Sequence, residues 1–120
     1  ILGEVYMDIN QLREKALIYV SSKFQGKEEN VAKVERYIRF MVENDENKEF
    51  VFVSPIHSCG FLYNDVDYQT GLDMTLAILM RCDAMCVIPG WDEEPKSVGV
   101  QQEIDLAIKL GIPIYYIPKD

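Results

Sequence analysis

Short apolar runs alternate along the chain with segments whose apolar residues recur at helical spacing. The continuous runs, which we assign to strands, are 16–20, 50–53, 84–88 and 112–117, and the first of them is typical of a strand buried on both faces. Between them, apolar positions three and four residues apart predict amphipathic helices over 31–42, 68–82 and about 97–110. Strands that alternate with helices at these lengths indicate βαβ crossovers. We therefore predict an α/β fold, a three-layer sandwich around a parallel sheet of four or five strands.

Capping and breaking residues predict where these elements end. Asn30 is placed to cap the first predicted helix, and Ser97 is placed to cap the last one. Pro55 ends the second strand, so we expect a loop after it. In the last helix, Ile108 and Leu110 are assigned to the buried side together with the other apolar positions.

A chain of 120 residues predicts one domain with one hydrophobic core. For the opening segment, residues 1–15, two alternatives remain: a short helix before the first strand, or a segment that packs on a neighbouring subunit. The apolar residues that it offers are Ile1, Leu2, Val5, Tyr6, Met7 and Ile9. Because these residues are available for burial between subunits, we expect a homodimer or a homotetramer.

The charge balance excludes several classes of partner. Asp and Glu outnumber Lys and Arg by 20 to 12, which gives a formal net charge of -8. No run of Lys and Arg could neutralise a phosphate track, so duplex nucleic acid and anionic membranes are poor partners. No apolar stretch reaches the ~18–20 residues that span a bilayer, and the start lacks the basic region of a secretory signal. We expect a cytoplasmic protein.

Cysteine and histidine usage predicts no metal site. The three cysteines are odd in number, and His57 is the only histidine, so they cannot complete a Cys/His zinc set. Cys82 and Cys86 lie in an apolar run, where reduced thiols behave as small hydrophobic residues. This usage fits the reducing conditions of the cytosol.

The start of the last predicted helix is the strongest candidate for chemistry. Ser97 can cap the helix, Gly99 lets a ligand approach the backbone, and the open N–H groups there suit one phosphate. Glu103 lies on the same helix face as Gly99, about 6 Å further along the axis. This separation is comparable with the distance from a sugar phosphate to its anomeric carbon. A carboxylate can attack that carbon and hold the sugar covalently. The same spacing also fits a helix cap followed by a solvated glutamate.

Several short motifs, in their order, resemble the nucleoside 2-deoxyribosyltransferase-like superfamily, and in particular its small uncharacterised bacterial and phage members. The resemblance covers about residues 16–118 and rests on 19–22 with 30–31, 54–57, 81–83, 90–91, 97–99, Glu103 and 107–113. It implies a Rossmann-like, flavodoxin-related domain. It also implies cleavage or transfer of the N-glycosidic bond of a 2-deoxynucleoside or its 5′-monophosphate, with no metal and no organic cofactor.

The resemblance assigns roles by position. Glu103 matches the nucleophile, Ser97 and Gly99 match the phosphate- or sugar-binding turn, and Tyr19 matches a tyrosine beside the nucleophile. Thr75 stands where members of the superfamily place an acid that handles the proton on the base. This departure leaves a second hypothesis open, a non-catalytic nucleotide-binding or sensing module of the same fold.

The remaining candidates for binding the nucleoside or nucleotide follow the ends of predicted strands, where ligands bind in sheets of this kind. Ser21 and Ser22 come directly after the first strand. His57 either contacts the substrate or acts as an acid, or it is an ordinary surface-loop histidine. Trp91, beside Gly90, either stacks on a base at the pocket mouth or packs as a partly buried tryptophan.

Overall fold

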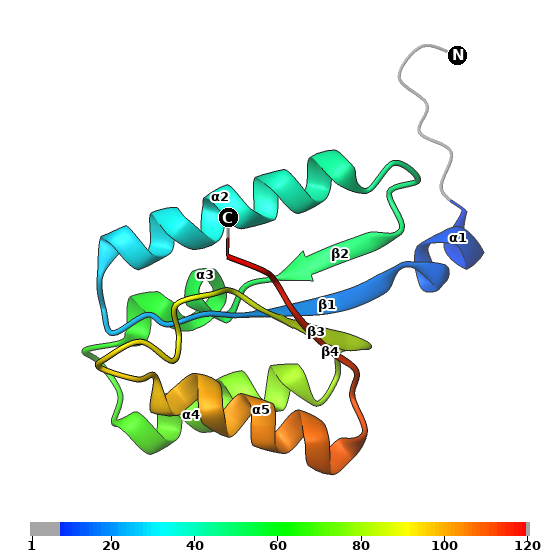
Figure 1. The fold of residues 1–120 in the computed structure, drawn as a ribbon. Helices are drawn as coiled ribbons and strands as arrows, with labels where there is room; N and C mark the ends of the chain where they lie inside the picture. The colour runs from blue at the N-terminus through cyan, green and yellow to red at the C-terminus, as the bar shows by residue number, and fades with distance from the viewer. Residues whose placement is uncertain (1–7, 120) are drawn as a thin grey trace.

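The computed structural model describes residues 8–119 and has one sheet between two layers of helices. Its four strands are all parallel and lie in the order β2-β1-β3-β4. Figure 1 shows helix α2 on one face of the sheet and helices α4 and α5 on the other. The predicted Rossmann-like three-layer sandwich is confirmed, with four strands. The strands are β1 (Ala16–Ser21), β2 (Phe50–Val53), β3 (Ala84–Val87) and β4 (Ile114–Tyr116), and the long helices are α2 (Glu28–Asn44), α4 (Tyr68–Leu79) and α5 (Val98–Leu110).

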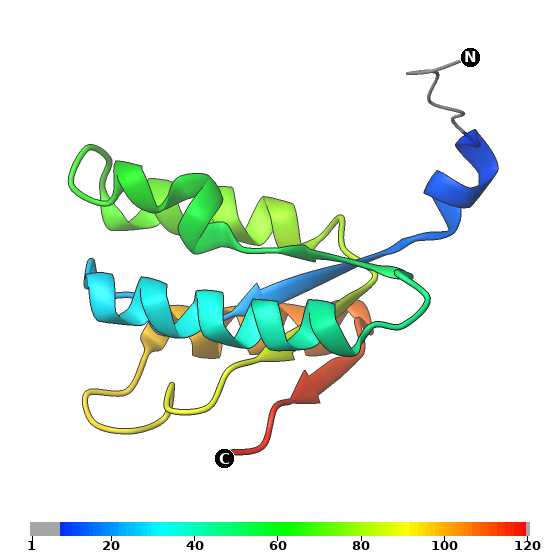
Figure 2. The same cartoon turned by 90° about the horizontal axis from the view of Figure 1, so that it is seen from above.

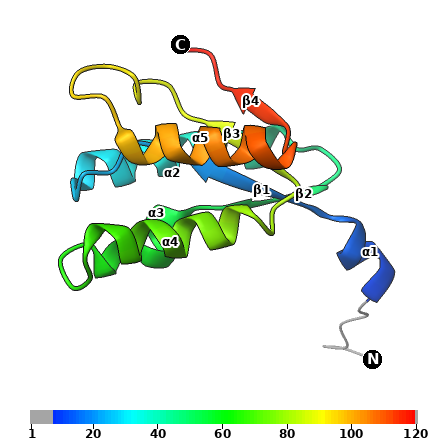
Figure 3. The same cartoon turned by 90° about the horizontal axis from the view of Figure 1, so that it is seen from below.

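The direction in which the sheet grows reverses at β1. Helix α2 connects β1 to β2 along one face, whereas the segment that contains α4 connects β2 to β3 along the opposite face (Figures 2 and 3). Strands β1 and β3 pair up to their carboxyl ends, with Ser21 beside Val87. In open α/β sheets, ligands bind outside the strand ends at such a switch point. The fold therefore places the candidate site beyond the carboxyl ends of β1 and β3.

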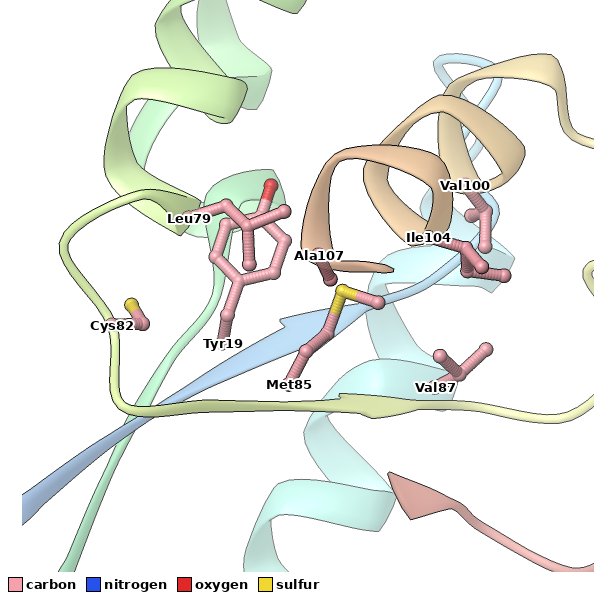
Figure 4. Packing of buried hydrophobic residues seen from close by; sticks show 8 residues of the cluster. All are labelled: Tyr19, Leu79, Cys82, Met85, Val87, Val100, Ile104 and Ala107. Carbon is pink, nitrogen blue, oxygen red and sulfur yellow. The ribbon is translucent and has the colours of Figure 1, made fainter. Parts of the chain in front are cut away.

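Side chains on the two faces of the sheet form separate hydrophobic clusters, because side chains alternate along each strand. On the face covered by α4 and α5, Tyr19 rises from β1 between Leu79 of α4 and Ala107 of α5 (Figure 4). The same alternation turns Ser21 toward the same face as Tyr19. The cluster under α2 is formed by Val20, Val34, Ile56, Cys86 and Ile88.

Helix α2 starts earlier than its capping signal predicts. Lys27 is the N-cap residue, so Asn30 lies inside the first turn and not before it. The Asn30 side chain folds back and donates a hydrogen bond to the Phe24 carbonyl at 2.8 Å, which anchors the loop instead of capping the helix. Even α2, with 17 residues, is not a membrane span, and no helix in residues 8–119 is long and apolar enough to cross a membrane.

The assignment of Ile108 and Leu110 to the buried side of α5 is wrong. Their side chains are 67% and 44% exposed. The buried positions of α5 are Val100, Glu103, Ile104 and Ala107. At about 100° per residue, Ile108 and Leu110 lie on opposite edges of this stripe in the last turn before Gly111, and neither edge is covered there.

The segment after β2 is helical, although the proline indicated a loop. Helix α3 (Pro55–Cys59) follows the strand directly and is continued by the 3-10 turn η1 (Gly60–Leu62). Ser54 is the N-cap, since its Oγ accepts from the His57 backbone N–H, and Pro55 occupies the first turn. A serine followed by proline starts a helix as readily as it ends a strand, because the missing N–H of proline needs no partner there.

The opening segment contains helix α1 (Ile9–Glu14), capped by the Asp8 side chain. None of its residues is buried, and Ile9 and Leu12 are more than half exposed. Figure 2 shows that α1 lies at the end of the sheet where β1 begins, away from the carboxyl ends of the strands. The apolar residues Ile1 to Met7, on which the expectation of subunit contacts also rests, lie outside the described residues.

Candidate functional site

Glu103 lies where α5 faces the carboxyl end of β1, and it is 6% exposed. Its Oε1 accepts a hydrogen bond from the Ser21 hydroxyl at 2.7 Å. Its Oε2 accepts a hydrogen bond from the Tyr19 hydroxyl. Both donors are fully buried, so neither hydroxyl can turn to water instead. The structure therefore brings three of the predicted site residues together and holds the carboxylate in one position.

Burial and hydrogen bonding act in opposite directions on the ionisation of Glu103. Burial raises the pKa of Glu103 to about 7, and the hydrogen bonds from Tyr19 and Ser21 limit that rise. Burial, together with the charge of Glu103, also raises the pKa of Tyr19, so the phenol keeps its proton and remains a donor. The site thus holds a carboxylate that ionises near neutral pH and has a hydroxyl donor for each oxygen.

A cavity of about 520 Å³ opens over Glu103. Its wall is built by the loop after β1, by α3 with η1, by α4 and by the start of α5. Ser22, Ser97 and Gly99, which the sequence placed in the site, line this cavity with Glu103. Small-molecule pockets commonly occupy about 300–1,000 Å³, so the cavity has room for a nucleotide. Its apolar lining includes Phe24, Ile56, Leu62, Tyr63, Leu72 and Val100.

The start of α5 has the geometry that the sequence predicted. Ser97 is the N-cap, and its Oγ accepts from the Val100 N–H at 3.2 Å. A Cβ added to Gly99 would lie 3.9 Å from the Tyr68 hydroxyl, which is ordinary contact, so packing does not require glycine there. The bare backbone at Gly99 leaves space on the cavity wall next to the first turn of the helix.

Thr75 also lines the cavity, next to the Tyr19 phenol. Its hydroxyl donates to the Leu72 carbonyl at 2.9 Å, within α4. The second carboxylate in the lining belongs to Asp67, which the sequence analysis did not single out. Asp67 caps α4 by accepting from the Thr70 N–H at 2.7 Å, and hydrogen bonds from Thr70 lower the pKa of Asp67. An aspartate directly before a helical apolar pattern was the available signal for it.

Gly90 and Trp91 lie elsewhere, on a second cavity of about 410 Å³ that Glu93 and Lys119 also line. Trp91 packs against the hydrophobic cluster under α4 and α5, as a partly buried tryptophan does. The Lys96 ammonium stands 5.2 Å from the centroid of the indole. Gly90 adopts a positive φ of 99°, a backbone conformation that favours glycine, so the turn alone accounts for this residue.

His57 is not among the described residues that line either cavity. Its Nδ1 shares a hydrogen bond with the Ser54 hydroxyl at 2.7 Å, and its Nε2 lies 2.8 Å from a Glu35 carboxylate oxygen. The histidine thus ties α3 to α2. For metals, no group of three or more His, Cys, Asp or Glu side chains within residues 8–119 could hold an ion.

Residues 16–117 match the model of a protein family described as a domain of unknown function, DUF7768. The match spans the whole sheet, from β1 through β4. No curated protein and no solved structure matches the chain. The chain belongs to the DUF7768 family.

Proposed function

We propose that this member of the DUF7768 family cleaves or transfers the N-glycosidic bond of a (deoxy)nucleoside or its 5′-monophosphate. The observation that carries the proposal is the Glu103 carboxylate, held by Tyr19 and Ser21 beneath the 520 Å³ cavity. A buried carboxylate with both oxygens hydrogen-bonded is costly for a small domain to maintain. Its position at the switch point of the sheet is where a ligand would meet it.

In the proposed reaction, ionised Glu103 attacks the anomeric carbon of the sugar. The C1′–N bond breaks as a bond forms between C1′ and a glutamate oxygen, and the base leaves with the electron pair. Water or a second base then attacks C1′ and restores the carboxylate. Tyr19 and Ser21 orient the nucleophile throughout, because each donates to a different oxygen.

The first turn of α5 is the proposed site for the 5′-phosphate. Gly99 and Ser97 line the cavity wall, and Gly99 lies about one helical turn from Glu103, ~6 Å along the axis. Open N–H groups and the positive end of the helix dipole favour an anion there.

The second candidate function is a non-catalytic module that binds or senses a nucleotide. Thr75 favours it, because an alkyl hydroxyl on the cavity wall supplies no proton to a departing base. A panel of deoxynucleoside 5′-monophosphates separates the two functions, with free base measured by chromatography. Release of base that is lost in Glu103→Ala supports the enzyme, whereas binding without release supports the module.

Phosphate should stabilise the protein if it binds at the start of α5. We expect inorganic phosphate or a deoxynucleoside monophosphate, at 100 times its Kd, to add about 2.7 kcal/mol to the free energy of unfolding and to raise Tm by several degrees. Ser97→Ala should reduce this increase. Differential scanning fluorimetry measures it.

A cap-preserving variant serves as the control. Ser97→Asp keeps a good N-cap residue but places a negative charge where the phosphate would bind, so the phosphate-dependent rise in Tm should disappear. Ser97→Ala by itself removes a cap worth about 1 kcal/mol, so the comparison is between Tm with and without ligand for each variant. If no phosphate-bearing ligand changes Tm, the anion site is wrong.

We further propose that the chain assembles as a homodimer or a homotetramer. Exposed apolar side chains on α1, Ile9 and Leu12, support subunit contacts at that end of the sheet. Light scattering at micromolar concentration should return two or four times the mass of the chain, and Leu12→Glu should lower it. A monomer under these conditions would contradict the assembly.

A further inference from the structure

We propose that the substrates of this cavity are N-glycosides of cationic heteroaromatic bases, whose base departs as a neutral molecule. Nucleotides of N7-alkylated purines and of N-substituted pyridinium rings belong to this class. The inference rests on the proposed function and specifies its substrates. Two features of the cavity support it: the groups that could donate a proton to a leaving base, and the aromatic and charged side chains of the cavity wall.

A neutral base carries negative charge as the glycosidic bond breaks, and an enzyme normally relieves it with a general acid. Within the described lining, Glu103 and Asp67 are the two carboxyl groups, and the lining includes no histidine. Glu103 is the attacking group. Asp67 has a lowered pKa and is ionised as the cap of α4, so it has no proton to give at neutral pH.

Three hydroxyl groups in or beside the cavity already donate their protons within the protein. The Thr75 hydroxyl donates to the Leu72 carbonyl, and the Tyr68 hydroxyl donates to the Gln102 side chain at 3.1 Å. The Tyr19 proton is directed at Glu103. These groups therefore do not supply a proton to a departing base. A cationic base departs as a neutral molecule and needs no such proton.

The walls and the charge of the cavity suit a cationic ring. Phe24 and Tyr63 form an edge-on pair, with ring centroids 5.2 Å apart and an interplanar angle of 78°, and both line the cavity. Aromatic faces attract cations, and the ionised Asp67 adds negative charge to the same cavity. The one lysine of the described lining, Lys96, lies over the Trp91 ring.

The charges balance in the proposed step. The Glu103 carboxylate forms an ester bond to C1′, and the C1′–N bond breaks with its electron pair moving into the cationic ring. One negative and one positive charge disappear together, giving a neutral ester and a neutral base. Water then bonds to C1′, the carboxylate is restored, and one proton goes to solvent.

A cationic ring would also prepare the nucleophile. Burial raises the pKa of Glu103 to about 7, which leaves much of it protonated at neutral pH. A positive charge in the same cavity favours the ionised form. Binding of the cation therefore generates the carboxylate that attacks it.

The test compares two nucleotides that differ in one methyl group. The first is 7-methyl-2′-deoxyguanosine 5′-monophosphate, and the second is 2′-deoxyguanosine 5′-monophosphate; release of base is followed by chromatography and corrected for the rate without protein. We expect kcat/KM for the cationic nucleotide to exceed that for the neutral one by about 10²-fold or more, which is what a general acid would otherwise supply. An enzyme that protonates N7 would show a ratio near one or below it.

A charge variant tests the part played by the wall. Asp67→Asn keeps a good N-cap on α4 but removes the negative charge, so the preference for the cationic nucleotide should fall several-fold. Asp67 and Asp73 are both exposed carboxylates, but Asp73, in α4 itself, lies outside the cavity lining, so Asp73→Asn should leave the preference unchanged.

The outcomes separate this inference from the function on which it rests. Equal, Glu103-dependent rates with both nucleotides would overturn the cationic substrate class and leave the glycosidic function standing. Release from neither nucleotide would overturn both. An unchanged preference in Asp67→Asn would contradict the role given to its charge.

Discussion

Glu103→Gln is expected to abolish release of base, with kcat falling by about 10³-fold or more. An amide oxygen is too weak a nucleophile to form the ester with C1′. The side chain keeps its size, and the Tyr19 and Ser21 hydroxyls can still hydrogen-bond to it, so the cavity should retain its shape. The measurement is base release by chromatography under single-turnover conditions, alongside nucleotide binding by fluorimetry to show that the variant is folded.

A trapped intermediate tests the same assignment directly. A 2-fluoro-2-deoxyribosyl substrate with a good leaving group should form the ester faster than water removes it, because fluorine slows its breakdown. Intact-protein mass spectrometry should then show one added sugar on the wild-type chain and none on Glu103→Gln. Digestion should map the sugar to the peptide that contains Glu103. A label on Asp67 instead would overturn the assignment of the nucleophile.

The layers of the fold were predictable because the strands stand out as continuous apolar runs between helical patterns. The edge strands β2 and β4 keep exposed side chains, whereas the central strand β3 is buried on both faces. Helix α3 was not predictable in this way, since five residues make too few turns for an apolar period to emerge. Its signal was local, the Ser54–Pro55 pair, and proline supports two interpretations at a strand end.

The candidate site was predictable where it depends on one helix. Gly99 and Glu103 share a face of α5 and Ser97 caps the same helix, so a local pattern of residues indicated this part of the cavity wall. The hydroxyl donors lie more than 80 residues away in β1, and only the packing of α5 on the sheet brings Tyr19 and Ser21 to Glu103. Residues of one loop can also face different cavities. Trp91 lines the cavity of about 410 Å³, whereas Ser97 lines the cavity over Glu103.

Glu103→Gln should also stabilise the protein at alkaline pH. Burial raises the pKa of Glu103 in the folded state to about 7, from an ordinary value of 4.5. The folded state therefore holds the proton more tightly than the unfolded state does, and the free energy of unfolding falls as pH rises from about 4.5 through 7. At about 1.4 kcal/mol per pKa unit, the ionised carboxylate costs about 3 kcal/mol at pH 8. Glutamine never ionises and avoids this cost.

Urea unfolding at two pH values measures the effect. We expect the variant to exceed the wild type by about 3 kcal/mol at pH 8 and the difference to shrink toward zero at pH 4.5. Asp105→Asn, which removes an exposed carboxylate from the same helix, is the control for lost charge. If the variant and the wild type differ in free energy of unfolding by the same amount at both pH values, burial does not oppose the ionisation of Glu103. Stability gained at pH 8 together with activity lost would indicate that the fold keeps a destabilising charge because the chemistry requires it.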